Sequence, residues 1–119
     1  MAALDLSVDL SPEHKRGLLL RNPVMTASGT FAYGLDWPFF DVNELGAIVT
    51  KSTTLHPRSG NPQTRTAETP AGMLNSVGLQ NPGVDEVVAT YAPVWARWSV
   101  PVIVSILGAT PGEYAAVAA

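Results

Sequence analysis

The sequence contains no cysteine, only two histidines, and few basic residues for its 119 positions. Without cysteine the chain forms no disulfide and no thiolate metal site, which fits a reducing compartment. Seven Lys and Arg against ten Asp and Glu give a formal net charge of -3, so no basic stripe is available to hold a phosphate backbone. We therefore expect neither a secreted disulfide scaffold nor a nucleic-acid partner, and no metal site.

A leader pattern and a long apolar run are also lacking. Residues Met1 to Leu10 include Asp5 and Asp9 and do not show a basic start followed by a long apolar stretch, which is the pattern of a signal peptide. The most apolar later run, Val100 to Ala109, contains a Pro and is much shorter than the about 20 residues of a membrane helix. The expectation is a cytoplasmic protein that does not enter a membrane.

The chain does contain many apolar residues, and Gly and Pro residues divide them into separate segments. Hydrophobic residues make up 46% of it, enough for a core, and ten Gly and ten Pro separate the apolar runs. Alternation from Leu4 to Leu10, a break, and renewed apolar residues from Leu18 to Leu20 predict an N-terminal β-hairpin. Three later segments predict buried strands of a parallel or mixed sheet: Pro23 to Ala27, Ala47 to Thr53, and Pro101 to Leu107.

Two helices are expected between these strands. The first covers Phe39 to Leu45 and would be closed by Gly46 in the left-handed conformation. Apolar residues at three- and four-residue steps predict a longer helix over Asp85 to Trp98. Pro93 should kink or shorten that helix.

The last helix and the order of elements indicate the fold class. A helix should begin after Thr110 with Pro111 at its first position, and it reaches Ala119 without a residue that would close it, so we expect the chain to be cut inside an element. Strand, helix and strand with short links are typical of βαβ units, found in barrels and in doubly wound sheets. A barrel takes about 250 residues, so three such units are a little under half of one, and expressed alone they would aggregate or be molten.

In parallel α/β folds, functional groups gather where strands end at their carboxyl side. After the first strand, Gly29 among small residues lets the backbone approach a flat ring or a phosphate, although an ordinary tight turn is equally compatible. The second strand ends in Lys51 beside several hydroxyls, where a buried cation would need an anion. The competing interpretation of Lys51 is a snorkelling surface residue.

A third segment, Glu68 to Gly83, is too long and too ordered in character for a linker. Gly78 frees backbone amides to face an anion such as a carboxylate. Asn75 offers a donor and an acceptor in one side chain, which suits the edge of an amide-containing heterocycle. The pattern predicts binding of an anionic heterocycle.

Three segments in this order, Asn22 to Gly29, Val49 to Thr54 and Glu68 to Gly83, resemble the dihydroorotate dehydrogenases, flavin enzymes of pyrimidine synthesis. The form of residues 68–75 is closest to the bacterial NAD-linked branch. The resemblance implies an α/β fold that is the N-terminal portion of a (β/α)8 TIM barrel preceded by a β-hairpin. Residues 1–119 would form about the first three βα units of a single FMN-binding domain.

The resemblance also implies an activity. It is the FMN-dependent oxidation of dihydroorotate to orotate in the synthesis of UMP, with electrons passed to NAD through a partner subunit that carries FAD and an iron–sulfur cluster, on a homodimer. Two alternatives remain at this point. One is a dihydropyrimidine dehydrogenase-type flavin barrel acting on uracil-like rings, and the other is an inactive fragment that only binds flavin or a metabolite.

Matched residue by residue, the resemblance assigns two sets of binding residues. Ser105 stands where the family usually has Asn, so it would reach the flavin only through a water or a small shift. The proton would be taken by a Cys that lies beyond Ala119, so no catalytic base is expected in this stretch. The FMN set is Ser28, Lys51, Ser52 and Ser105, and the substrate set is Lys51, Asn75, Ser76, Val77, Gly78 and Leu79.

Other conspicuous residues have ordinary interpretations. His14 and His56 are expected at the surface, and Arg58 to Arg65, rich in Pro, Gly and Asn, is expected to be a mobile loop. Three indole side chains are expected to pack against helices rather than stack on a flavin: Trp37, Trp95 and Trp98.

Overall fold

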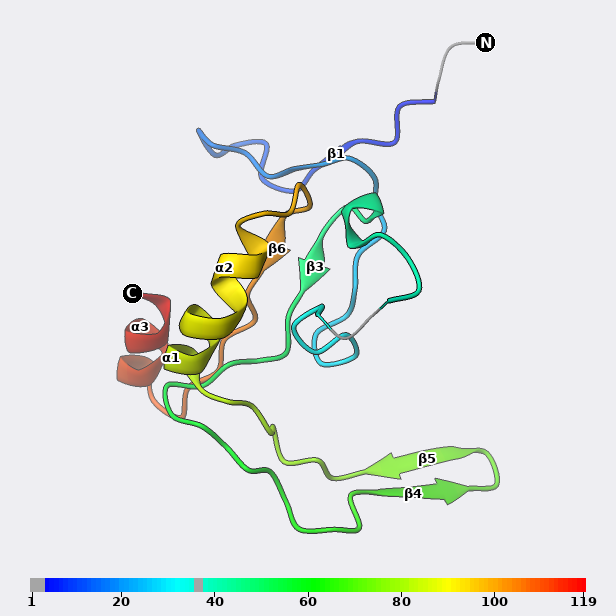
Figure 1. The fold of residues 1–119 in the computed structure, drawn as a ribbon, viewed down its shortest axis with the longest axis vertical. Coiled ribbons are helices and arrows are strands. Elements are labelled where there is room, and N and C mark those ends of the chain that lie inside the picture. Colours follow the sequence, from blue (N-terminus) through cyan, green and yellow to red (C-terminus); the bar gives the residue numbers. More distant parts are fainter. Residues whose placement is uncertain (1–3, 36–37) are drawn as a thin grey trace. The chain divides into compact units, whose positions relative to one another are not determined.

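The computed structural model describes residues 4–35 and 38–119 (Figure 1). The chain divides into two compact units. Unit 1 comprises Met1–Lys51 and Val94–Ser105, and unit 2 comprises Ser52–Pro93 and Ile106–Ala119. The expected packing of Trp37 lies outside the described residues. None of the helices formed by the described residues has the length and hydrophobicity of a membrane span.

The parallel strands are the framework of unit 1. Strand β3 (Ile48–Val49) pairs in parallel with β6 (Val102–Ile103), and the two arrows lie side by side in Figure 1. On the other side of this segment Met25 forms a parallel bridge with Ala47. The first expected strand therefore lies parallel to the second, and the second to the third, in agreement with the predicted parallel or mixed sheet. The prediction that the first segment is a buried strand is wrong, because it forms only the Met25 bridge and Val24 is 58% exposed.

The regular strands are nevertheless much shorter than predicted, because side chains replace part of the backbone ladder. The hydroxyl of Thr26 accepts a 2.9 Å hydrogen bond from the Val49 amide and lies 3.2 Å from the Val49 carbonyl oxygen, to which it donates. The hydroxyl of Thr50 likewise accepts from the Ser105 amide at 3.2 Å. Threonine hydroxyls can take over such bonds because they both donate and accept.

The core of unit 1 forms around these strands. Leu20, Ile48 and Val100 are buried in it, and Tyr33 is only 6% exposed. The indole nitrogen of Trp95 donates a 3.0 Å hydrogen bond to the Tyr33 carbonyl oxygen, and the two rings lie 6.3 Å apart. Trp95 thus packs within the unit, as expected, and Trp98 does so against Gly34.

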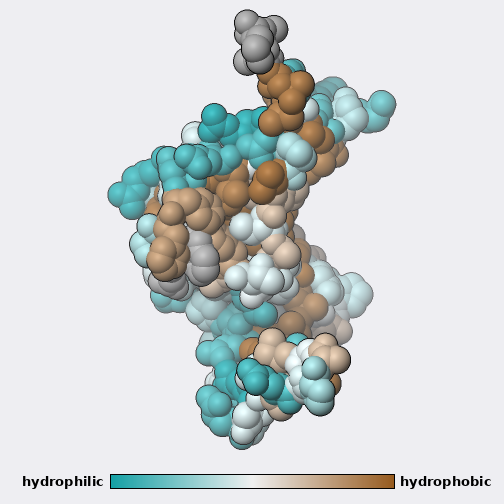
Figure 2. All heavy atoms as spheres, turned by 90° about the vertical axis from the view of Figure 1, so that its right-hand side faces the viewer, coloured by the Kyte–Doolittle hydropathy of each residue, from teal (hydrophilic) through white to brown (hydrophobic). Residues whose placement is uncertain are grey.

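The N-terminal segment contains a short antiparallel pair. Strand β1 (Val8–Asp9) pairs with β2 (Leu19–Leu20), with Val8 opposite Leu20. The carboxylate of Asp9 closes the connection by accepting from the amides of Ser11 and Leu18, at 2.9 and 3.1 Å. Hydrophobic surface is visible at this end of the chain in Figure 2, in agreement with exposures of 81% for Leu4 and 51% for Leu6.

The short helix before β3 differs from the prediction. Only η1 (Val42–Glu44) forms, a 3-10 helix whose N-cap, Asp41, accepts a 2.9 Å hydrogen bond from the Asn43 amide. Gly46 does not close it in the left-handed conformation, so that expectation is wrong. Glycine is required there because a Cβ atom would lie 1.9 Å from the Asn22 carbonyl oxygen.

The longer helix is divided into three parts: α1 (Val84–Glu86), the π-helical η2 (Val87–Tyr91) and α2 (Ala92–Trp95). It therefore ends before the predicted Trp98. Pro93 lacks an amide hydrogen and its ring crowds the preceding turn, and the wide π turn just before it accommodates both effects. The predicted disturbance by Pro93 is confirmed.

Unit 2 contains a parallel bridge and the last helix of the chain. Thr53 forms a parallel bridge with Ile106, and the Leu107 amide donates to the Thr53 carbonyl oxygen at 2.9 Å. Helix α3 (Pro111–Ala118) begins as predicted, with the hydroxyl of Thr110 accepting from the Glu113 amide at 3.2 Å.

Unit 2 also contains a hairpin that the sequence analysis missed. Strands β4 (Thr66–Thr69) and β5 (Gly72–Asn75) pair antiparallel, with Thr66 opposite Asn75, and all their residues are exposed. The segment interpreted as one ordered loop therefore starts as a β-hairpin joined by Pro70 and Ala71. Before it, residues 58–65 form a loop, as expected, but hydrogen bonds along its length hold it in place.

Candidate functional site

Thr50 joins the three strand ends of unit 1. This fully buried residue donates its amide to the Ile103 carbonyl oxygen at 3.1 Å. Its own carbonyl oxygen accepts a 3.0 Å hydrogen bond from the Ser28 hydroxyl. Its hydroxyl accepts from the Ser105 amide at 3.2 Å and donates to the Lys51 carbonyl oxygen at 3.1 Å. The structure thus brings Ser28, Lys51 and Ser105 together around one buried threonine.

The sequence analysis did not single out Thr50. The signal that could have identified it is a threonine inside an apolar strand directly before the lysine. A hydroxyl in that place needs a partner when buried.

The Lys51 side chain lies against the turn that follows the first strand segment. Gly29 has a φ of +82°, and a Cβ atom there would be 3.3 Å from the Lys51 ammonium nitrogen and 3.6 Å from its Cδ. The Lys51 amide donates to the carbonyl oxygen of Ala32 at 2.8 Å. The side chain of the half-buried Lys51 therefore lies beside Gly29, and its backbone amide is bonded to Ala32, unlike a lysine that extends into solvent.

The remaining binding residues of the prediction belong to unit 2. Ser52 is half-buried directly after Lys51, and Asn75 is the exposed last residue of β5. Residues 76–79, here called the substrate loop because the resemblance predicts that they bind the substrate, follow it without regular structure. Gly78 and Leu79 both have left-handed backbone, with φ of +79° and +56°. Val77 separates this left-handed pair from Asn75 and Ser76.

Asn81 fixes the end of the substrate loop, and the sequence analysis missed it. The side chain is 5% exposed and its amide oxygen accepts from the backbone amides of Thr54 and Gly83, at 3.1 and 3.0 Å. Its amide nitrogen donates to the Leu79 carbonyl oxygen at 2.9 Å. One buried carboxamide therefore connects the end of the second strand to the substrate loop and to the start of α1.

A cavity of about 160 Å³ lies along the hairpin and is lined by two of the predicted substrate residues, Asn75 and Ser76. The guanidinium-bearing Arg65 also lines it. The remaining lining residues are Thr64, Thr66, Ala67 and Leu74. Its walls thus combine an amide, hydroxyls and one cation.

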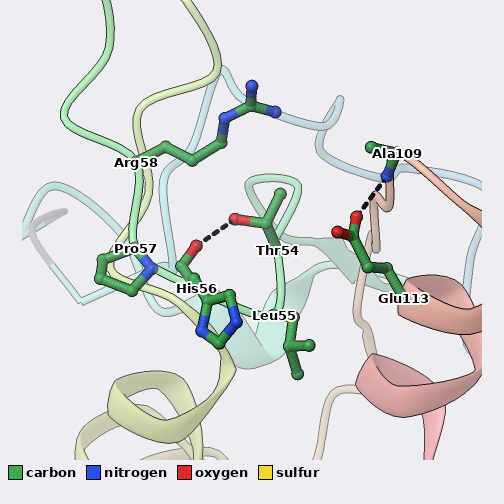
Figure 3. A pocket seen from close by; sticks show the side chains of 7 residues that line it. All are labelled: Thr54, Leu55, His56, Pro57, Arg58, Ala109 and Glu113. Atoms are coloured by element: carbon green, nitrogen blue, oxygen red, sulfur yellow. Dashed lines mark hydrogen bonds between the residues drawn. The ribbon is translucent and has the colours of Figure 1, made fainter.

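A second cavity of about 170 Å³ contains none of the predicted binding residues (Figure 3). The Thr54 hydroxyl donates to the His56 carbonyl oxygen at 2.6 Å, and the Glu113 carboxylate accepts from the Ala109 amide at 2.6 Å. These polar groups stabilise the loop and the start of α3. His56 is exposed, as expected for a surface residue. The lining consists of Thr54, Leu55, His56, Pro57, Arg58, Ala109 and Glu113.

Residues 13–119 match the family described as dihydroorotate dehydrogenase. The chain belongs to the dihydroorotate dehydrogenase family. A TIM-barrel type of fold follows from this membership, and the described residues supply neighbouring parallel strands and helices of that kind without a closed barrel. In the part of the chain that the structure describes, no group of three or more acidic or histidine side chains is placed to share a metal ion.

Three relatives share the name dihydroorotate dehydrogenase B (NAD(+)), catalytic subunit. The protein of Desulforudis audaxviator is 56% identical over 103 residues, which cover 86% of this chain and 34% of that protein. Those of Pelobacter propionicus and Geotalea daltonii are 50% and 49% identical over 115 residues, covering 96% of this chain and 36% of each relative. The chain thus spans about a third of the length of the relatives it matches.

Proposed function

We propose that the protein is a catalytic subunit that oxidises dihydroorotate to orotate with FMN in the synthesis of UMP. Membership in the family and the names of the relatives support the reaction. The structural observation that carries it is the Thr50 network, which collects Ser28, Lys51 and Ser105 at the carboxyl ends of adjacent parallel strands. Ligands of parallel α/β folds bind at that edge.

The residues of unit 1 fit a flavin. Gly29 presents bare backbone beside the Lys51 ammonium, in a place where a Cβ atom would lie 3.3 Å from that nitrogen, so a flat ring can approach closely. FMN held there would supply the acceptor for the hydride of the substrate. The positive charge of Lys51 favours the negative charge that the ring system gains. In this proposal Ser28, Lys51 and Ser105 of unit 1 hold the FMN together with Ser52, the residue directly after Lys51.

The substrate set of the proposal comprises Lys51, Asn75, Ser76, Val77, Gly78 and Leu79. Asn75 would pair with the amide edge of the pyrimidine ring because its side chain both donates and accepts. The left-handed backbone at Gly78 and Leu79 would offer backbone amides to the carboxylate. The cavity beside Asn75 and Ser76 supports this placement.

We place residues 1–119 as about the first three βα units of one FMN-binding TIM barrel, preceded by the β1–β2 pair. The names of the relatives support a separate electron-transfer partner and NAD as acceptor. We assign FAD and an iron–sulfur cluster to that partner, a homodimer to the catalytic subunit, and the cytoplasm to the complex. The base would be a Cys beyond Ala119.

Ligand protection tests the proposal. The protein, expressed from the complete reading frame with its FMN, should melt at a higher temperature in orotate than without ligand, because a ligand that binds only the folded state stabilises it. Uracil at the same concentration should have little effect, since it lacks the carboxylate. Protection by uracil and not by orotate would instead indicate a dehydrogenase of uracil-like rings.

A further inference from the structure

The loop before β4 is bonded directly to the substrate loop. The Asn61 side-chain nitrogen donates to the Ser76 carbonyl oxygen at 3.1 Å and to the Ser76 hydroxyl at 2.9 Å. The Asn61 backbone amide donates to the Val77 carbonyl oxygen at 3.0 Å. One residue thus makes three hydrogen bonds to two neighbouring members of the substrate loop.

Two glycines make this close approach possible. Gly60 has a φ of +76°, and a Cβ atom there would lie 2.5 Å from the Val77 carbonyl oxygen. Opposite it, a Cβ atom on Gly78 would lie 2.7 Å from the Asn61 backbone nitrogen. Each loop therefore has a glycine where the other loop comes nearest, and the two backbones are packed without room for side chains.

Arg65 stabilises the loop that carries Asn61. Its Nε donates to the Asn61 carbonyl oxygen at 2.6 Å, and its Nη2 donates to the Ser59 carbonyl oxygen at 3.0 Å. Its carbonyl oxygen accepts from the Ser76 amide at 2.8 Å, and its Nη1 also bonds the Gln80 side chain. The backbone of Asn61 is consequently held by Arg65, independently of the hydrogen bonds that Asn61 makes to Ser76.

Asn61 can be replaced with little effect on the stability of the core. Its side chain is exposed, so replacing it removes little buried apolar surface. Its side-chain hydrogen bonds go to a residue of the substrate loop. A loop that is ordered before the ligand arrives binds more tightly, because less of the binding free energy is spent on ordering it.

We propose that Asn61 is a positioning residue that keeps the substrate loop in its binding conformation in the absence of dihydroorotate. The proposal rests on the proposed function for the identity of the ligand. Asn61 itself does not need to touch the substrate, because it acts through Ser76 and Val77.

The test compares Asn61→Ala and Asn61→Asp with the wild type in the complete, FMN-loaded protein. Asn61→Asp keeps the shape but loses the donor to Ser76. Both variants should bind orotate about tenfold more weakly in calorimetry, with unchanged FMN content and melting temperature. KM for dihydroorotate should rise similarly, while kcat changes less than about twofold because saturating substrate orders the loop. Gln63→Ala, an exposed carboxamide of the same loop, should match the wild type.

The outcomes distinguish the two proposals. Wild-type protein that does not bind orotate would refute the proposed function. If the wild type binds orotate and Asn61→Ala binds it equally well, the function stands and the assignment of Asn61 fails. Hydrogen exchange of the ligand-free wild type provides a check without mutation: the amides of Asn61 and Ser76 should be protected, and exchange at the rate of an unstructured chain would overturn the assignment.

Discussion

The hydroxyl of Ser28 donates a 3.0 Å hydrogen bond to the carbonyl oxygen of Thr50, the residue directly before Lys51. The turn after the first strand segment is thereby attached to the strand that carries the lysine. The hydroxyl of Thr50 extends this connection to Ser105. The relative placement of the three strand ends therefore depends on one buried threonine.

Replacement of Thr50 by Val should destabilise the complete protein by about 1–3 kcal/mol, because the Ser105 amide and the Lys51 carbonyl oxygen lose their partner while the shape is retained. FMN content should fall as well. Denaturant unfolding and flavin absorbance measure the two effects. Thr50→Ser retains the hydroxyl and should restore most of both.

The control for this prediction is Thr69→Val, the same change at an exposed position of β4. It should leave stability and FMN content close to those of the wild type. A Thr50→Val protein as stable as this control would show that the hydroxyl network is not needed.

Lys51→Ala should leave the fold largely intact and slow flavin reduction by dihydroorotate about 100-fold or more, because a fixed positive charge is lost where negative charge develops. Anaerobic stopped-flow absorbance measures this rate. Lys15→Ala removes a lysine with the same charge from an exposed turn and should have no effect. Reduction of the Lys51→Ala protein at the wild-type rate would remove Lys51 from the mechanism.

The parallel framework could be predicted because its signal is local: apolar runs around Ile48 and Val102 indicate buried strands, and these do pair. The β4–β5 hairpin could not be found in the same way, since it is exposed on both faces and lacks apolar alternation. The roles of Asn61 and Asn81 depend on contacts with residues distant in the sequence, such as Ser76 for Asn61 and Thr54 for Asn81. A single sequence does not show such pairings.

The capping carboxylate of Asp41 should make stability depend on pH. The hydrogen bond from the Asn43 backbone amide lowers the pKa of Asp41 below its usual value. Since the folded pKa is the lower one, the stabilisation is present above the unfolded pKa of about 4 and is lost as the pH falls through the folded pKa. Denaturant unfolding should therefore show Asp41→Ala to be less stable than the wild type at pH 7, with a smaller difference at acidic pH. A difference that does not change with pH would contradict this origin.

Gly78→Ala should greatly weaken orotate binding. The added methyl group would lie 2.7 Å from the Asn61 backbone nitrogen, and a φ of +79° is strained for alanine, at about 1–3 kcal/mol. The substrate loop would have to move away from Asn61, so calorimetry should show a loss in affinity of about tenfold or more. Gly72→Ala is the matched control, since its φ is not in the left-handed region and its nearest neighbour, the Thr69 hydroxyl, is 3.9 Å away. Equal affinities of the two variants would mean that the conformation of the substrate loop at Gly78 is not the one that binds the substrate.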